Sequence, residues 1–185
     1  MDERQIPGAS PLMQLAPEEP EAGAWRAEPL STLVNTMMAR REPANGTPCR
    51  PVVLAVDGRS NAGKTTLAAR IRQVVPGSAV VHTDDIAWKH SRFGWADLLI
   101  EGILEPVHQG RAVSYRPPRW VEHGREGSIE IPATCALLVI EGDGAGRREV
   151  AHLLDALIWV QSDEREAERR ARGEKVALEW FEEDL

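Results

Sequence analysis

Glycine, lysine and threonine stand at a fixed spacing in residues 58–65, which read GRSNAGKT and fit the pattern G-x-x-x-x-G-K-[S/T] at every fixed position. The run PVVLAVD at 51–57 precedes this segment and has the β-branched, apolar composition of a buried strand. The segment GKTTLAARIRQVV at 63–75 follows with the composition of a helix. A strand, a glycine-rich loop and a helix in this order predict a loop that wraps around phosphate groups.

The chemistry of phosphate binding explains why these residue types stand at this spacing. Glycines let the backbone curl closely around an anion, and the start of the following helix adds its positive end. Lys64 is expected to reach the β and γ phosphates and Thr65 to ligate Mg²⁺, while Asn61 tolerates a left-handed backbone. The predicted ligand is a nucleoside triphosphate, ATP with Mg²⁺, bound by Gly58, Arg59, Ser60, Asn61, Ala62, Gly63, Lys64, Thr65 and Thr66.

Strand-like and helix-like segments alternate along the rest of the chain. Helices are predicted at 30–41, 63–75, 96–109, 147–154 and 163–185, strands at 51–57, 78–85, 135–142 and 156–162, and short strands or extended segments at 111–120 and 127–132. This alternation, with the glycine-rich loop, predicts an α/β P-loop NTPase fold, in which a parallel sheet lies between helices in three layers. The predicted organisation is a flexible arm at 1–28, a helix and connector at 29–50, and a P-loop kinase-like domain at 51–185.

Composition narrows the classes of partner. The formal net charge is −7, so the chain lacks the overall basic field that gathers nucleic acid. No stretch approaches the roughly 18 to 20 apolar residues of a membrane-spanning helix, and the acidic start MDERQIPGAS is not a secretory signal. We therefore expect a cytoplasmic protein whose partner is a small molecule, not nucleic acid or a membrane.

An acidic pair follows the second predicted strand, in the segment HTDD at 82–85. Ligands of open α/β sheets bind at the carboxyl ends of the strands, where a carboxylate is placed to accept a proton from an attacking hydroxyl. Asp84 is the preferred catalytic base and a candidate metal ligand, and Asp85 is a candidate contact for the acceptor. The alternative is that the pair only caps the next helix or turn.

Glu141 ends the most apolar predicted strand of the chain, in the segment VIEG. An acidic group there is expected beside Thr65, where it would orient Mg²⁺ or the water around it. The alternative is an exposed glutamate at a strand end. The segment lacks the D-x-x-G motif of GTPases, and no N-K-x-D motif follows, so a GTPase is disfavoured.

Arginines cluster in the last predicted helix. Arginines on a lid can stabilise charge on a transferring phosphoryl group, and Arg169 and Arg172 are the candidates for this catalytic role. The alternative is pairing along a solvated helix. The cluster comprises Arg165, Arg169, Arg170 and Arg172, and Glu164, Glu166, Glu168 and Glu174 interleave with it.

A basic and aromatic patch occupies the middle of the chain. Aromatic faces stack on bases, and guanidinium groups bind phosphate or sugar oxygens. The alternative is a tryptophan packed in a small core beside solvated arginines. The substrate-binding candidates are Tyr115, Arg116, Arg119 and Trp120, with Asp85 from the acidic pair.

In their order and spacing, these segments resemble the uridine kinase and phosphoribulokinase family of P-loop kinases, and in particular its small actinobacterial-type uridine kinase-like members. The resemblance runs from about Val52 onward and rests on AVDGRSNAGKTTLA, HTDD, YRPPRW, LLVIEGDGAG and the IWV strand before an arginine-bearing helix. It implies the nucleoside or nucleotide kinase-like form of the P-loop NTPase fold, and ATP-dependent phosphorylation of a small-molecule hydroxyl, usually the 5′-OH of uridine or cytidine. It also implies that Asp84 is the base and that residues 115–120 lie near the acceptor.

The sequence departs from that family where Ile86-Ala87-Trp88 replaces an aromatic pair after the acidic turn, and where Gly173 follows Arg172. Two alternatives to a nucleoside kinase therefore stand. One is a P-loop kinase for another small alcohol. The other is a nucleotide-binding protein without kinase activity.

Overall fold

The apolar run before the glycine-rich loop forms the central strand of the sheet, β1 (Val52–Gly58), and all of its residues are buried. The side chains of β1 alternate between two hydrophobic clusters: Val53 and Ala55 join one, and Leu54 and Val56 join the other. A strand covered on both faces must be apolar throughout, which explains the sequence of β1. The computed structural model describes residues 27–39, 50–91 and 94–172.

Four parallel strands form the sheet, in the order β2-β5-β1-β6. The other three are β2 (Ala79–His82), β5 (Leu137–Glu141) and β6 (Ala156–Val160). In the register of the sheet, Glu141 lies beside Val56 on one side and beside His82 on the other. The ends of β1, β5 and β2 therefore meet at one edge, and the residues that follow these strands gather there.

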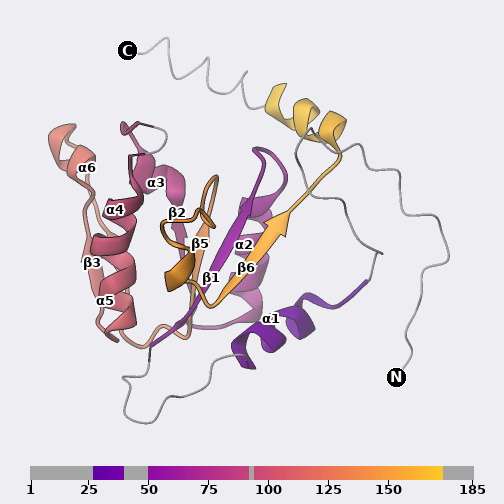
Figure 1. Cartoon of the computed structure of the whole chain (residues 1–185), viewed down its shortest axis with the longest axis horizontal. Helices are drawn as coiled ribbons and strands as arrows, with labels where there is room; N and C mark the ends of the chain where they lie inside the picture. Colours follow the sequence, from indigo (N-terminus) through magenta and orange to yellow (C-terminus); the bar gives the residue numbers. More distant parts are fainter. Residues whose placement is uncertain (1–26, 40–49, 92–93, 173–185) are drawn as a thin grey trace.

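Helices cover both faces of the sheet, so the fold has three layers (Figure 1). On one face lie α1 (Leu30–Ala39) and α2 (Lys64–Val74), which pack on Leu54, Leu137 and Val139. On the other lie α3 (Thr83–Ala87), α4 (Ala96–Leu99), the π-helical turn η1 (Ile100–Leu104) and α5 (Glu105–His108). This arrangement confirms the predicted α/β fold with a parallel sheet.

The segment after α5 differs in part from the prediction. The strands β3 (Val113–Tyr115) and β4 (Ile129–Ile131) lie within the two predicted short segments, and the structure pairs them antiparallel. Between them, residues predicted to be extended form the helix α6 (Pro118–Glu122). Proline at the first helical position lacks only an N–H that has no partner there, and its fixed φ suits a helix, so the two prolines start this helix and do not prevent it.

The helix predicted at 147–154 is wrong, because this segment forms turns and a short 3₁₀ helix, η2 (Ala151–Leu153). The Gly146 N–H bonds Asp57, and the Asp155 N–H bonds the Val53 carbonyl, so both ends of the segment are fixed to β1. The last helix is observed at 164–172. The predictions for 1–26, 40–49 and 173–185 lie outside the described residues. In the described part of the chain, no helix is long and apolar enough to cross a membrane.

Candidate active site

The loop between β1 and α2 has the strained backbone that its sequence predicts. Gly58, Asn61 and Gly63 have φ angles of 142°, 61° and 104°. A Cβ atom on Gly58 would lie 2.2 Å from the Val160 carbonyl oxygen, so this position admits only glycine. The left-handed Asn61 confirms the prediction for that residue, and Gly63 leads directly into α2. The loop therefore curls at the amino end of an 11-residue helix, which is the geometry of an anion site.

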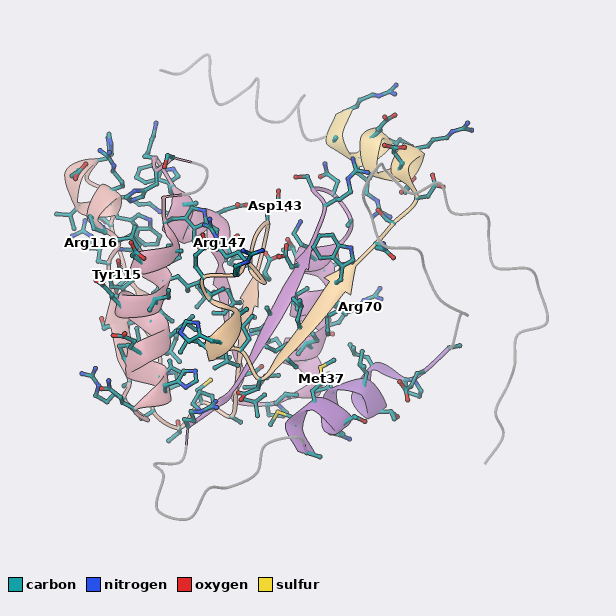
Figure 2. The ribbon with its side chains drawn as sticks, in the orientation of Figure 1. Met37, Arg70, Tyr115, Arg116, Asp143 and Arg147 are labelled. Atoms are coloured by element: carbon teal, nitrogen blue, oxygen red, sulfur yellow. The ribbon has the colours of Figure 1, made fainter. Side chains whose placement is uncertain are left out.

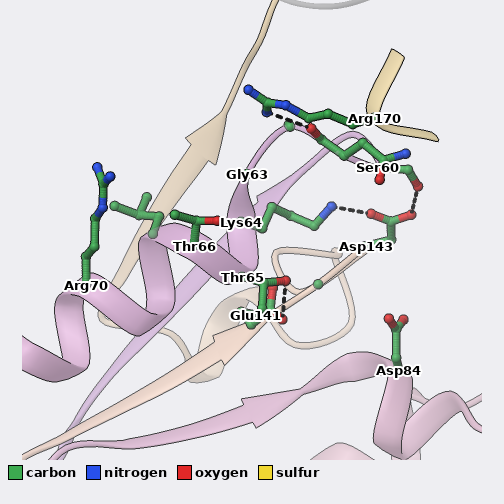
Figure 3. A pocket seen from close by; sticks show the side chains of 14 residues that line it. Ser60, Gly63, Lys64, Thr65, Thr66, Arg70, Asp84, Glu141, Asp143 and Arg170 are labelled. Carbon is green, nitrogen blue, oxygen red and sulfur yellow. Dashed lines mark hydrogen bonds and ion pairs between the residues drawn. The ribbon is translucent and has the colours of Figure 1, made fainter. Parts of the chain in front are cut away.

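Lys64 is buried in this loop, and its ammonium group has three oxygen partners. Its Nζ donates to the carbonyls of Gly58 and Arg59 at 3.0 and 2.8 Å. It also lies 2.6 Å from Oδ1 of Asp143, whose Oδ2 accepts the Ser60 hydroxyl at 2.8 Å (Figure 3). Asp143 was not predicted from the sequence. Its position between two glycines, two residues after Glu141, was the only available signal.

Thr65 and Glu141 lie side by side in the pocket, as predicted (Figure 3). The Thr65 hydroxyl donates to Oε1 of Glu141 at 3.1 Å, and Nδ1 of His82 lies 2.5 Å from the same oxygen. The side chain of Glu141 is buried, which excludes the alternative of an exposed strand-end glutamate. The hydrogen bond with Glu141 raises the pKa of His82 and outweighs the effect of burial.

Asp84 lies on the wall of the same pocket, opposite the loop. The strand predicted at 78–85 ends earlier, at His82. Asp84 and Asp85 therefore belong to the first turn of α3, where acidic side chains are favourable because the amino end of a helix is positive. Burial raises the pKa of Asp84, and the negative charges of Asp143 and Glu141 raise it further, against the opposing effect of Lys64. Asp84 is therefore a carboxylate with increased proton affinity beside the predicted phosphate-binding loop at 58–66, called the phosphate loop below.

Asp57 fixes the loop that carries Asp143. Its carboxylate accepts the backbone N–H groups of Gly58, Gly144 and Gly146 at 2.7, 3.0 and 2.8 Å. These bonds attach the phosphate loop and the loop after β5 to one buried side chain. This role of Asp57 was not predicted from the sequence.

Lys64, Thr65, Asp84, Glu141 and Asp143 line one open pocket of about 720 Å³. Its arginines are Arg70 and Arg170, and Nη1 of Arg170 donates to the Asn61 carbonyl at 3.1 Å. The pocket is lined by residues 60–67, Arg70, Asp84, Glu141, Gly142, Asp143 and Arg170. Most of the predicted phosphate-binding residues therefore lie together with Asp84 and Glu141.

Arg169 and Arg172 do not line this pocket. Arg169 bonds Glu166 at 2.7 and 2.8 Å and is mostly exposed, and Arg172 lies 3.7 Å from Glu168. The hydrogen bond from Arg169 is the largest of the effects that lower the pKa of Glu166 to about 2. In this conformation both arginines make the within-helix pairs that the alternative interpretation expected.

Two of the predicted acceptor residues, Asp85 and Trp120, belong to a separate cluster at α3. Trp120 is buried, and its indole N–H donates to the Asp85 carbonyl at 2.9 Å. The guanidinium of Arg125 lies 3.7 Å from the Trp120 ring centroid and 5.4 Å from that of Trp88. Arg125 also forms an ion pair with Asp85 at 2.6 Å. Arg125, which was not predicted from the sequence, thus organises this cluster.

The other three candidates lie farther from the phosphate loop. The Tyr115 ring packs over Gly102, where a Cβ atom would meet the ring at 2.5 Å. Arg116 donates to the Arg125 carbonyl, and Arg119 pairs with Glu122. Figure 2 shows Tyr115 and Arg116 on the side of the molecule formed by β3 and α4, away from Asp143. None of the three lines the pocket around Lys64.

Comparison with known proteins identifies the fold. No protein-family model and no curated protein matches the sequence. The structure is similar to that of a possible uridine kinase from Bacillus stearothermophilus, with a TM-score of 0.50 and 20% identity over 70% of this chain and 78% of the other. It is also similar to a candidate fructose transport system kinase from Silicibacter sp. TM1040, with a TM-score of 0.59 and 16% identity over 86% of this chain and 84% of the other. The chain therefore has the α/β fold of P-loop kinases.

Proposed function

We propose that this protein is an ATP- and Mg²⁺-dependent phosphotransferase that phosphorylates a hydroxyl group of a small molecule, foremost a nucleoside such as uridine or cytidine. One observation carries the proposal: the phosphate loop with Lys64 and the carboxylate of Asp84 line the same pocket. A phosphoryl donor and an acceptor hydroxyl must meet in one place. The phosphate loop with Lys64 suits the phosphoryl donor, and the Asp84 carboxylate suits the acceptor hydroxyl.

On the donor side, the backbone N–H groups of residues 58–66 and the start of α2 would bind the phosphates. Lys64 would neutralise charge on the β and γ phosphates. Arg170 already reaches the loop through Asn61 and is placed to contact a bound triphosphate. We assign Arg169 and Arg172, from the same helix, to a lid that closes during turnover.

Thr65, Glu141 and Asp84 supply the oxygen donors that a hard cation such as Mg²⁺ prefers. Thr65 and Glu141 are already 3.1 Å apart at the foot of the pocket, and all three residues line it. Within the described ranges, no three or more His, Cys, Asp or Glu side chains form a group that could hold a metal ion, so the proposed site needs ligands from the substrate as well. Magnesium in kinases is held by one or two carboxylates together with substrate phosphates, so this donor set fits it. When bound, the ion would neutralise charge on the triphosphate.

On the acceptor side, Asp84 would accept the proton of the attacking hydroxyl. The hydroxyl oxygen would form a bond to the γ phosphorus while the bond from that phosphorus to the β–γ bridging oxygen breaks, which releases ADP. The raised pKa of Asp84 supports this role, because a stronger base removes a hydroxyl proton more readily.

The acceptor class rests on the family resemblance and on the chemistry beside α3. Asp85 is held by Arg125 and Trp120 next to Asp84, and Trp88 adds an aromatic surface. Tyr115, Arg116, Arg119 and Trp120 complete the proposed acceptor region. A nucleoside offers a base to stack and a 5′-OH to phosphorylate. A sugar is the second candidate, since one structural neighbour is described as a fructose transport system kinase.

A coupled assay for ADP release tests the proposal against panels of nucleosides, sugars and other small alcohols. We expect acceptor-dependent turnover that Asp84→Asn reduces at least about 100-fold, as is typical when a general base is lost. Asp97→Asn, at an exposed aspartate on α4, is the matched control and should retain turnover. Intact ATP binding with no turnover for any acceptor would instead identify a nucleotide-binding protein without kinase activity.

A further inference from the structure

The phosphate loop already holds an anionic group, the carboxylate of Asp143. Oδ1 of Asp143 lies 2.6 Å from the Lys64 ammonium, and Oδ2 accepts the Ser60 hydroxyl at 2.8 Å. Both partners belong to the segment predicted to hold phosphate, and both oxygens of the carboxylate are engaged (Figure 3). A carboxylate with both oxygens bound in this way resembles a phosphate group, because it is negatively charged and accepts hydrogen bonds from the same side chains.

The position of Asp143 is fixed by the backbone around it. Asp57 holds Gly144 and Gly146 on the far side of the loop. Gly142 has a φ of 133°, and a Cβ atom there would lie 2.0 Å from Oγ1 of Thr83. The contact with Lys64 therefore comes from a loop that is anchored on both sides of Asp143.

We propose that Asp143 is an internal competitor for the phosphate loop and a specificity residue that makes the loop reject ligands with a single phosphate. The inference rests on the proposed function, because it assumes that the loop binds phosphates. A single phosphate would gain Lys64 and Ser60 only by displacing a carboxylate that already satisfies both. A triphosphate would also contact the backbone N–H groups and the arginines of the pocket, so it would offset the loss of the Asp143 contacts.

The charges around the pocket agree with this role. Lys64, Arg70 and Arg170 line it together with Asp84, Glu141 and Asp143. The three carboxylates match the three cations in number, so these side chains do not give the pocket a net positive charge that would attract small anions. Asp143 is half-exposed and the side chain of Lys64 is 8% exposed, so the carboxylate can move into solvent while the lysine stays in place.

Asp143→Asn tests the proposal by isothermal titration calorimetry with inorganic phosphate, inorganic triphosphate and ATP, each in the same Mg²⁺ buffer. We expect at least a tenfold tighter binding of inorganic phosphate by the variant and a smaller gain for ATP, so that the preference for ATP over phosphate narrows. Glu149→Gln is the matched control, because Glu149 is 52% exposed against 50% for Asp143 and is paired with Arg147. This control makes the same change in net charge and should bind every ligand as the wild type does.

Three results would overturn the inference. The first is an unchanged preference for ATP over phosphate in Asp143→Asn, with thermal unfolding that shows a folded protein. The second is an equal gain in Glu149→Gln, which would indicate a general field effect. The third is weaker ATP binding by Asp143→Asn in Mg²⁺ but not in EDTA, which would make Asp143 a metal ligand. Asp143→Ser repeats the test if the asparagine variant does not fold. Failure of the proposed function is distinct, because the wild-type protein would then bind no ATP, or would bind ATP without turning over any acceptor.

Discussion

The Asp57 carboxylate accepts the backbone N–H of Gly144 at 3.0 Å, although 87 positions separate these two residues in the sequence. This bond joins the end of β1 to the loop after β5. The same carboxylate accepts the N–H of Gly58, the first residue of the phosphate loop. One buried side chain therefore sets the distance between Lys64 and the loop that carries Asp143.

Asp57→Asn should destabilise the fold. An asparagine offers one oxygen acceptor in place of two, and its NH₂ group would face an N–H donor. We expect a loss of about 1–3 kcal/mol in the free energy of unfolding, the cost of a buried donor without a partner. Urea unfolding measures it, with the exposed Asp97→Asn as control. Equal stability of the two variants would show that the Asp57 bonds contribute little.

Gly142→Ala should be more damaging than a change at another glycine with positive φ. Gly124 has a φ of 67°, and a Cβ atom added there would meet no other atom within 4 Å, so Gly124→Ala reports the backbone cost alone. We expect about 1 kcal/mol for Gly124→Ala and at least about 3 kcal/mol for Gly142→Ala, because the new methyl group meets Thr83 and because a φ of 133° lies outside the left-handed region that L residues can adopt. Thermal unfolding of both variants tests this order, and similar losses would contradict it.

Arg170→Ala should weaken ATP binding about tenfold, since this side chain lines the pocket and contacts the phosphate loop. Arg169→Ala and Arg172→Ala should leave ATP affinity unchanged, because these side chains pair with glutamates on their own helix. Because we assign both arginines to a lid, the two substitutions should reduce turnover without changing ATP affinity. Calorimetry and steady-state kinetics separate the two effects. An equal loss of ATP affinity in Arg169→Ala would reject the distinction.

Stability should fall in acid partly through Asp155, which joins the start of β6 to β1. Burial raises the pKa of Asp155, but hydrogen bonds from Arg50 and from the Val53 N–H lower it more, so its pKa lies below the ordinary value. The unfolded chain, with a pKa of about 3.9, therefore binds a proton more readily than the folded protein. The stabilisation by the ionised Asp155 carboxylate is present above the pKa of the unfolded chain. It is lost as the pH falls through the lower pKa of the folded state.

The corresponding measurement is urea unfolding of the wild type and Asp155→Asn at neutral pH and near pH 3. The wild type should lose more stability between the two conditions than the variant, which lacks the titrating group. Asp97→Asn, which removes an exposed carboxylate, serves as the control. An identical pH dependence in wild type and Asp155→Asn would show that this carboxylate does not contribute to acid sensitivity.

The sequence by itself determined the parts of this protein that depend on local backbone geometry and on strand order. Glycine spacing predicted the curled loop, because only certain residues adopt those φ angles, and the φ of Asn61 agrees. Apolar runs predicted the parallel sheet. Since parallel strands end at one edge, Glu141 was expected beside Thr65, and it lies there.

Only the tertiary structure decided which side chains meet across the pocket. Asp143 reaches Lys64 across 79 positions because Asp57 and Gly142 fix its loop, and no local pattern encodes that distance. Similarly, Arg170 rather than Arg169 lines the pocket, because the docking of its helix sets which face turns inward. Short-range sterics can be read from neighbouring residues, whereas such contacts arise from the packing of the whole chain.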